Sequence, residues 1–163
     1  MRRVTVEEGR LAFRIPAIAL ERAKDGTVTI QISINNPDRR YTAVLPAVVW
    51  DHLSAEDAAA RGPQPKQPPL PKDKPPPFCH GWSINLEAAD AGKSWSQAVS
   101  TCSVLENGPA FTYAYELARL AIDNIEACAA AKAETEAKTA DSPERPIWAL
   151  IACGGRFAPR MLE

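Results

Sequence analysis

The residues of this chain that could do chemistry are four cysteines and two histidines. No two cysteines form a C-x-x-C pair, so the common zinc-ribbon and thioredoxin patterns are absent. Their even number in one half of the chain favours two disulfides, whereas four buried free thiols would suit a cytoplasmic protein. A zinc site that includes Cys79 and His80 would need irregular ligand spacing. We therefore expect disulfides, no metal and no cofactor. The cysteines are Cys79, Cys102, Cys128 and Cys153.

Cys79 and His80 are adjacent and could suggest a nucleophile with its base. Neighbouring side chains on a strand point to opposite faces, so these two would diverge. A dyad of Cys79 with His52 requires the two halves of the chain to meet. No G-x-S-x-G, H-E-x-x-H or dinucleotide-binding motif is present. We expect no catalytic residue; Cys79, His80 and His52 are the candidates that would make the protein a small hydrolase or transferase.

Other polar and aromatic groups have a structural explanation. The Gly-Lys-Ser at 92–94 lacks the upstream glycine of a phosphate-binding loop and is expected to be a turn. The pair Asp51-His52, together with Asp123 and Glu126, is expected on the surface or at helix ends. Four tryptophans in a modest core are more typical of packing than of a ligand platform. These are Trp50, Trp82, Trp95 and Trp148.

The elements around the cysteines predict how they pair. The segments 80–87 and 95–105 are expected to form a β-hairpin with its midpoint at 90–91. The second strand is ambiguous, because part of its pattern also fits a helix. A symmetric hairpin places Cys79 opposite Cys102, close enough for a disulfide. This gives the first predicted pair.

A long helix over residues 108–139 is the strongest single element of the sequence. Gly108 suits its N-cap and Pro109 its first turn, and the polar stretch 132–138 is expected to run into solvent. One face is apolar because apolar residues recur three and four apart. They are Phe111, Ala114, Tyr115, Ala118, Ala121, Ile122, Ile125, Cys128 and Ala129.

After a break at 141–146, the apolar run 147–153 is expected to be a buried strand. From Cys128 the helix would descend ~18 Å at 1.5 Å per residue. The strand would climb ~20 Å at about 3.3 Å per residue, so Cys153 returns to the level of Cys128. Cys128–Cys153 is therefore the second predicted pair.

The N-terminal third predicts an antiparallel meander with one wet face. Apolar and polar residues alternate in 11–15, 27–34 and 41–45. A three-residue loop at 24–26 would place the apolar residues of 18–21 and 27–34 on one face, with Gly26 in the left-handed region. The expected cross-strand pairs are Leu20 with Ile30 and Ile18 with Ile32.

A short helix is expected over 55–61. Ser54 and Asp57 match an S-x-x-D cap, and Gly62 with Pro63 would end the helix. Residues 63–77 follow as a proline-rich connector, extended and semi-rigid. A spacer explains this composition, although its PPLP motif would also suit an SH3 or WW domain.

Composition limits the class of protein. The chain has 163 residues and a net charge of −1, so we expect no positive electrostatic potential that would attract nucleic acid. No apolar run approaches the ~20 residues of a membrane span. The first 15 residues lack the apolar stretch of a signal peptide, which fits either a cytoplasmic protein or a replaced leader.

The expected fold class is α+β: an antiparallel β-meander with a short helix in 1–62, the connector 63–77, then 78–163 as a disulfide-containing unit of β-hairpin, long amphipathic helix and buried strand. The two units can share one core. The functional hypothesis is a small non-enzymatic protein of the bacterial envelope, periplasmic or extracellular, that contacts an unidentified protein partner. The alternatives are the Cys/His-dependent hydrolase or transferase and a cytoplasmic adaptor or regulator.

Overall fold

A computed structural model of the chain describes residues 1–8, 16–33, 40–66, 68, 82–90, 92–100, 108–138 and 145–157. These residues form a six-stranded antiparallel sheet with helices, which confirms the α+β class. The strands are β1 (Arg2–Glu8), β2 (Ala17–Arg22), β3 (Val28–Ser33), β4 (Arg40–Leu45), β5 (Trp82–Asp90) and β6 (Lys93–Ser100). The helices are α1 (Val48–Ala60), α2 (Pro109–Asn124), the 3-10 turn η1 (Glu126–Cys128), α3 (Ala129–Lys138) and α4 (Arg145–Phe157).

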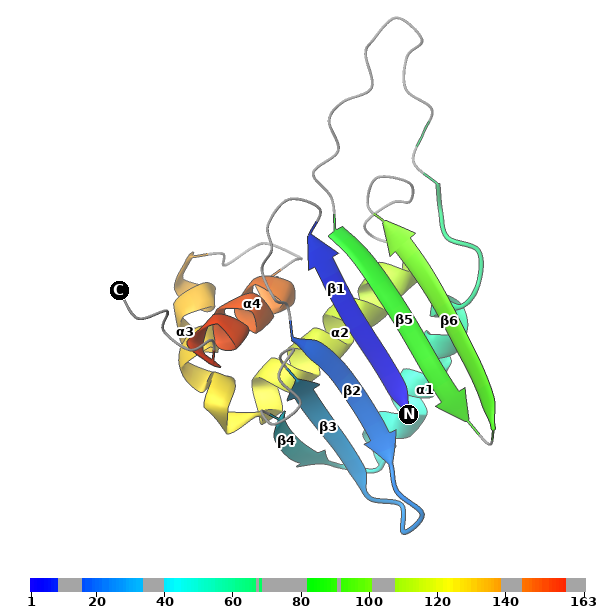
Figure 1. The fold of residues 1–163 in the computed structure, drawn as a ribbon, viewed down its shortest axis with the longest axis horizontal. Coiled ribbons are helices and arrows are strands. Elements are labelled where there is room, and N and C mark those ends of the chain that lie inside the picture. The colour runs from blue at the N-terminus through cyan, green and yellow to red at the C-terminus, as the bar shows by residue number, and fades with distance from the viewer. Residues whose placement is uncertain are drawn as a thin grey trace, which may run out of the picture.

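The sheet joins strands from both sides of the connector. Its order is β4-β3-β2-β1-β5-β6, so β1 lies between β2 and β5 (Figure 1). Strand β1 was not predicted, because its arginines and glutamates hide the alternation of Val4 and Val6 with polar residues. The strand expected at 11–15 lies outside the described residues. One hydrophobic cluster contains residues from both sides of the connector.

The loop between β2 and β3 confirms the three-residue turn. Ala23 N–H donates to the Thr27 carbonyl oxygen at 2.8 Å, which leaves residues 24–26 as the loop. Gly26 has φ +88°, in the left-handed region that favours glycine. The expected register follows. The pairs are Ile18 with Ile32 and Leu20 with Ile30.

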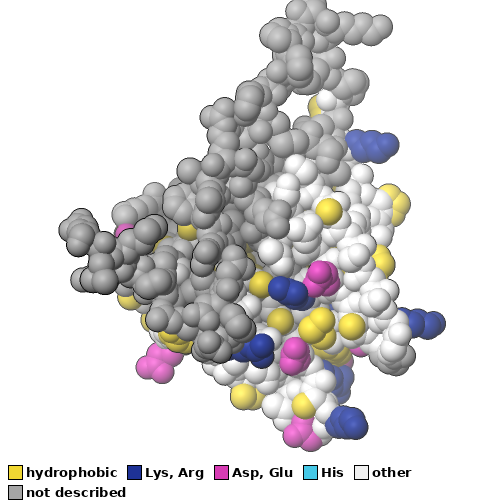
Figure 2. Space-filling view, in the orientation of Figure 1, with side chains coloured by type: hydrophobic (Ala, Val, Ile, Leu, Met, Phe, Trp, Pro, Cys, Tyr) yellow, Lys and Arg dark blue, Asp and Glu magenta, His cyan; other side chains and the backbone are white. Residues whose placement is uncertain are grey.

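Helix α2 packs across one face of β2, β3, β4 and β5 (Figure 1). Where it is described, the face turned to the viewer in Figure 2 is mostly white, the colour of uncharged polar side chains and backbone, with scattered hydrophobic and charged side chains. That face is not wet throughout, because Ala17 and Ala19 of β2 are buried at 9% and 6% exposure. The expectation of one solvated face therefore fails at the centre of the sheet.

Helix α1 is longer than the sequence pattern predicts. It begins at Val48 instead of residue 55, and its N-cap residue Ala47 makes no side-chain cap. Ser54 lies inside the helix, where its Oγ donates to the Trp50 carbonyl oxygen at 2.8 Å. Asp57 is buried instead of capping. The S-x-x-D pattern was misleading because those groups bond within the helix and to the sheet.

The start of the connector ties two helices together. Gln64 Nε2 donates to the carbonyl oxygens of Ala60 and Gly62, each at 2.9 Å. Ala110 N–H donates to Gln64 Oε1, also at 2.9 Å. One side chain thus caps the end of α1 and the start of α2. Most of the remaining connector lies outside the described residues.

The single long helix predicted for 108–139 is divided in two. Its start is as expected, with Gly108 at the N-cap and proline in the first turn. Ile125 is extended (φ −90°, ψ 105°) and ends α2, after which η1 leads into α3. The stretch 132–138 was expected to extend into solvent. Instead Thr135 is buried, and α3 packs against α4.

The run 147–153 is helical, in α4, and the predicted strand is wrong. Ile147, Leu150 and Cys153 are fully buried at a spacing of three. A short apolar run cannot separate a buried strand from a buried helix, and this spacing was the overlooked signal.

The β5–β6 hairpin confirms the expected strand over the described part of 95–105. Asp90 pairs with Lys93, and Gly92 in the turn has φ +81°. The midpoint is therefore 91–92, one residue later than predicted. Of the turn predicted at 92–94, only Gly92 lies in the turn, since β6 begins at Lys93.

Candidate functional site

The structure does not join the sequence-predicted catalytic candidates. His52 lies exposed on α1, with Nε2 3.5 Å from Glu56 Oε1. Cys79 and His80 lie outside the described residues. Within the described ranges, no group of three His, Cys, Asp or Glu side chains is placed to hold a metal ion. None of their helices is long and apolar enough to cross a membrane.

Cys128 and Cys153 lie at disulfide distance, with 5.1 Å between their Cα atoms, and both are fully buried. They were one of the two pairs expected from the sequence, but for a different reason. The chain descends α3 for ~15 Å and climbs α4 from Arg145 to Cys153 for ~14 Å, both at 1.5 Å per residue. Cys79 and Cys102 lie outside the described residues, so their pairing stays a prediction.

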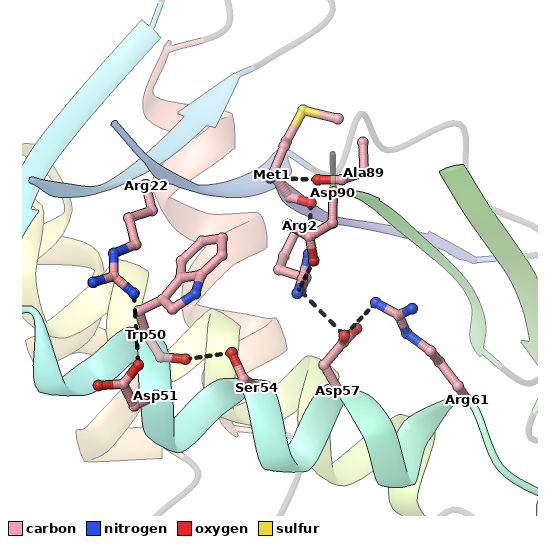
Figure 3. Close-up of polar contacts among 10 residues, drawn as sticks. All are labelled: Met1, Arg2, Arg22, Trp50, Asp51, Ser54, Asp57, Arg61, Ala89 and Asp90. Atoms are coloured by element: carbon pink, nitrogen blue, oxygen red, sulfur yellow. Dashed lines mark hydrogen bonds and ion pairs between the residues drawn. The ribbon is translucent and has the colours of Figure 1, made fainter. Parts of the chain in front are cut away.

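A cluster of charges around the buried side chains of Arg2 and Asp57 joins β1, α1 and β5 and is drawn in Figure 3. Arg2 of β1 places its Nε 3.1 Å from Asp57 Oδ2 of α1. Its NH2 group donates to Asp90 Oδ2, at the end of β5, at 2.7 Å. Asp57 also accepts a hydrogen bond from Arg61, the C-cap residue of α1. We call these four residues the Arg2–Asp57 cluster.

Two tryptophan rings lie against the arginines of the Arg2–Asp57 cluster. The Arg2 guanidinium lies 5.1 Å from the centre of the Trp50 ring, and Arg61 lies 4.9 Å from Trp95. Such cation–π contacts add attraction where the charge is shielded from water. Trp50 and Trp95 are partly buried against the core. The packing role expected for these two tryptophans fits this geometry.

The electrostatics of the Arg2–Asp57 cluster favour fixed charges. Burial lowers the pKa of Arg2, but the Asp90 hydrogen bond and the charges of Asp57 and Asp90 outweigh it and raise the pKa. The same hydrogen bond lowers the pKa of Asp90. Burial, helped by the Asp57 charge, raises the pKa of Tyr113. These pKa shifts keep Arg2 and Asp90 charged and Tyr113 neutral, which suits a structural clamp.

The second candidate is a pocket of about 400 Å³ between α2, α3 and α4, which we call the three-helix pocket. Lys132 Nζ lies 2.8 Å from Asp123 Oδ1 and bridges α3 to α2. Arg119 NH1 lies 3.3 Å from Asp123 Oδ2. Charged and apolar side chains both line the pocket. Its described lining residues are Arg119, Ile122, Asp123, Lys132, Glu136, Arg145, Pro146 and Ala149.

Asp123 was expected at the surface or at a helix end, and this pocket was not predicted from the sequence. The spacing Arg119–Asp123 and Lys132–Glu136, four apart in each case, was the available signal. That spacing marks helix-surface ion pairs generally. The extended backbone at Ile125 ends α2 and lets the Arg119–Asp123 and Lys132–Glu136 pairs approach each other. No sequence pattern predicts this break.

These observations define an α+β protein with a six-stranded antiparallel sheet, a helical layer and a cysteine-linked pair of C-terminal helices. In comparisons with known proteins, no family model, no curated protein and no solved structure matches the chain.

Proposed function

We propose that this is a non-enzymatic protein of the bacterial envelope, periplasmic or secreted, that acts through contacts with another protein. The observation that carries the proposal is the fully buried Cys128–Cys153 pair at disulfide distance. Disulfides persist in oxidising compartments and are rare in the cytosol. A bridge over this separation of 25 residues stabilises by about 3 kcal/mol in the chain-entropy model.

The polar groups of the described residues support a role without catalysis. The charged groups of the Arg2–Asp57 cluster are engaged with one another, and no substrate-sized opening is needed to explain them. His52 is exposed on α1, with its Nε2 3.5 Å from Glu56 Oε1.

An exposed apolar corner supports protein contact. Val44, on the edge strand β4, is 73% exposed, and Val48, in the first turn of α1, is 68% exposed. Contiguous exposed apolar patches are typical of interaction sites, and we propose that Val44 and Val48, four residues apart in the chain, belong to one. We call these two residues the β4 corner.

Thiol mapping tests the location. The native gene, with its own upstream coding sequence, is expressed in its host, and free thiols are alkylated before digestion without reduction. We expect the protein in the envelope fraction and a Cys128 peptide linked to a Cys153 peptide. A peptide joining Cys79 to Cys128 or Cys153 would contradict the pairing. Four free thiols in a cytoplasmic fraction would overturn the envelope assignment and favour an adaptor or a thiol enzyme.

Photo-crosslinking tests the contact. A photoreactive amino acid replaces Val44 in one variant and exposed Ala58 of α1 in a matched control. We expect a discrete adduct with one envelope protein from position 44 and a much weaker one from position 58. Equal labelling at both positions, or none at 44, would show that the β4 corner is not the contact surface.

A further inference from the structure

We propose that the outer edge of β4 binds an extended segment of the partner protein, which adds to the sheet as an antiparallel strand. This inference rests on the proposed function, because it names the kind of partner segment that the β4 corner takes. The two can fail separately, since a partner can touch the β4 corner without pairing with the backbone of β4.

Strand β4 ends the sheet on one side (Figure 1). It pairs with β3 in unbroken register, and among the described residues no strand pairs with its other side. An edge strand presents backbone donors and acceptors on its open side, and proteins commonly protect such edges with a bulge, a proline or several charges. The sequence of β4, RYTAVL, has no proline and a single charge, at Arg40. Its open edge is therefore suited to pairing.

The hydrogen-bond pattern of the sheet shows which backbone groups of β4 point outward. In an antiparallel sheet, pairs that exchange hydrogen bonds alternate with pairs that do not. Ala23 N–H donates to the Thr27 carbonyl oxygen, so these two residues are a bonded pair at the β2–β3 turn. Counting from this pair, the even-numbered residues of β3 bond to odd-numbered residues of β4. The even-numbered residues of β4 thus point their N–H and C=O groups away from the sheet.

The far side of the sheet supports this count. Carried through the registers of β2, β1 and β5, the same alternation predicts a bonded pair of Met1 with Ala89. Met1 and Ala89 do exchange two hydrogen bonds, each at 2.9 Å. The assignment of outward groups on β4 therefore agrees with contacts four strands away.

Arg40, Thr42 and Val44 carry the outward backbone groups. Their side chains are exposed, and none of their outward groups has a hydrogen-bond partner among the described residues. An extended segment laid along this row would satisfy all of them, because its own N–H and C=O groups repeat at the same spacing. In such strand addition the main chain supplies affinity and alternate side chains supply specificity.

The side chains on both faces of β4 favour an apolar segment. On one face Val44 is 73% exposed, and the chain continues past the strand through the exposed apolar residues 46–48. An apolar residue opposite Val44 would remove apolar surface from water, which is favourable. On the other face Tyr41 and Ala43 are partly buried and pack against the core. Apolar residues at the alternate positions of the added strand would continue that layer.

Arg40 specifies the other end of the segment. It is exposed and makes no ion pair with the described residues. In an antiparallel partner strand, the residue opposite Arg40 lies four positions after the residue opposite Val44. An acidic residue there would form a cross-strand pair of opposite charges. The edge therefore fits an extended segment with an apolar residue followed, four positions later, by Asp or Glu.

A second copy of this chain fits the edge less well than such a segment. Strand β4 contains no acidic residue, so two paired β4 strands would leave each Arg40 without one opposite. This difference in charge complementarity assigns the edge to a partner protein.

Titration by NMR tests the proposal on the full-length protein. The probe is the peptide acetyl-Ser-Gly-Val-Ile-Thr-Val-Glu-Gly-Ser-amide, in which the first valine aligns with Val44 and the glutamate with Arg40. We expect saturable shifts of the backbone amides of β4 and β3. N-methylation of the peptide's threonine removes the donor that faces Thr42 and should weaken binding about tenfold or more. Replacing its glutamate with lysine should also weaken binding, because like charges would then lie opposite each other.

Proline substitutions test the backbone of the protein. Thr42→Pro removes an outward N–H and no bond to β3, which is the kind of position where an edge strand accepts proline. It should weaken binding of the peptide about tenfold or more. Ser96→Pro makes the same change on the opposite edge of the sheet, since the odd-numbered residues of β6 bond to β5, and it should leave binding unchanged.

Thr42→Val keeps the N–H and should bind the peptide as the wild type does. If circular dichroism shows that Thr42→Pro is unfolded, the N-methylated peptide decides the matter. No binding of the unmodified peptide at about 5 mM, or equal binding of its N-methylated form, would overturn the proposal. A dimer of the free protein that Thr42→Pro dissociates would overturn it too, because the edge would then belong to a second copy.

Photo-crosslinking separates this inference from the proposed function. A photoreactive amino acid at position 44 is combined with Thr42→Pro, and we expect the partner adduct to be lost. An adduct of unchanged yield would leave the protein contact standing and overturn strand addition. If position 44 gives no adduct even with Thr42 intact, the proposed contact fails, and the peptide titration still decides this inference.

Discussion

Asp57 connects helix α1 to the sheet. It is buried, and it meets Arg2 from β1 and Arg61 from its own helix. A buried carboxylate is costly unless it is paired, and Arg2 is in the same position. Each therefore makes the burial of the other tolerable, and the pair fixes α1 against the first strand.

Asp57→Ala should lower the free energy of unfolding by about 3–5 kcal/mol, because among the described residues it leaves the buried Arg2 with the exposed Asp90 as its one acidic partner. The matched control is Asp51→Ala on the same helix. Asp51 is exposed and lies 3.6 Å from Arg22, and such surface pairs contribute about 0–1 kcal/mol. Urea unfolding of the two variants measures the difference. Similar losses would show that the Arg2–Asp57 cluster is not the buried clamp described here.

At the scale of elements, the ends of helices decide how this protein is put together. Gln64 serves the last turn of α1 and the first turn of α2 with one amide. Helix ends leave backbone groups unsatisfied, and a side chain that satisfies two ends also fixes the angle between them. Ile125 has a different effect: its extended backbone ends α2, so that α3 can turn toward α4.

Gln64→Ala should cost about 1–2 kcal/mol, because it removes the acceptor for Ala110 N–H and the donor to the end of α1. Gln31→Ala, on the opposite face of the sheet, is the control and should change stability by about 0.5 kcal/mol or less. Thermal unfolding monitors both. If the two substitutions have the same small effect, Gln64 is not a functional cap and the connector is a spacer from its first residue.

At the scale of the whole molecule, the sheet contains strands from both sides of the connector. β1 pairs with β2 on one side and with β5 on the other, and α2 packs on strands from both sides. Apolar residues of the first 62 residues therefore share one core with residues that come after the connector. A small unit that lacks its covering layer cannot offset its loss of conformational entropy.

Fragments 1–68 and 82–163 should each be largely unfolded when expressed alone. Mixed together, they should regain strand and helix signals, since the β1–β5 register of seven residue pairs re-forms the sheet. Circular dichroism and amide NMR spectra of the separate and mixed fragments measure this. A dispersed spectrum from 1–68 alone would show that the N-terminal meander is an independent folding unit.

Local signals in the sequence were sufficient where neighbouring residues decide the structure. The β2–β3 register follows from the alternation of apolar residues and from one glycine, because a shift of one residue would expose every apolar side chain. The start of α2 follows from Gly108 and Pro109 for the same local reason. The Cys128–Cys153 pair was expected from the lengths of one helix and a strand, but two helices, α3 and α4, bring these cysteines together, so this agreement does not come from a correct local signal.

Tertiary contacts decided the rest. The charged strand β1 exists because β2 and β5 offer hydrogen-bond partners on both sides, which no local pattern reveals. Residues 147–153 are helical because Ile147, Leu150 and Cys153 find a core on one side only, and periodicity in so short a run does not show this. The Arg2–Asp57 cluster and the three-helix pocket join side chains far apart in the chain. Their chemistry depends on distances that only the packed fold sets, since local propensity carries no information about which faces meet.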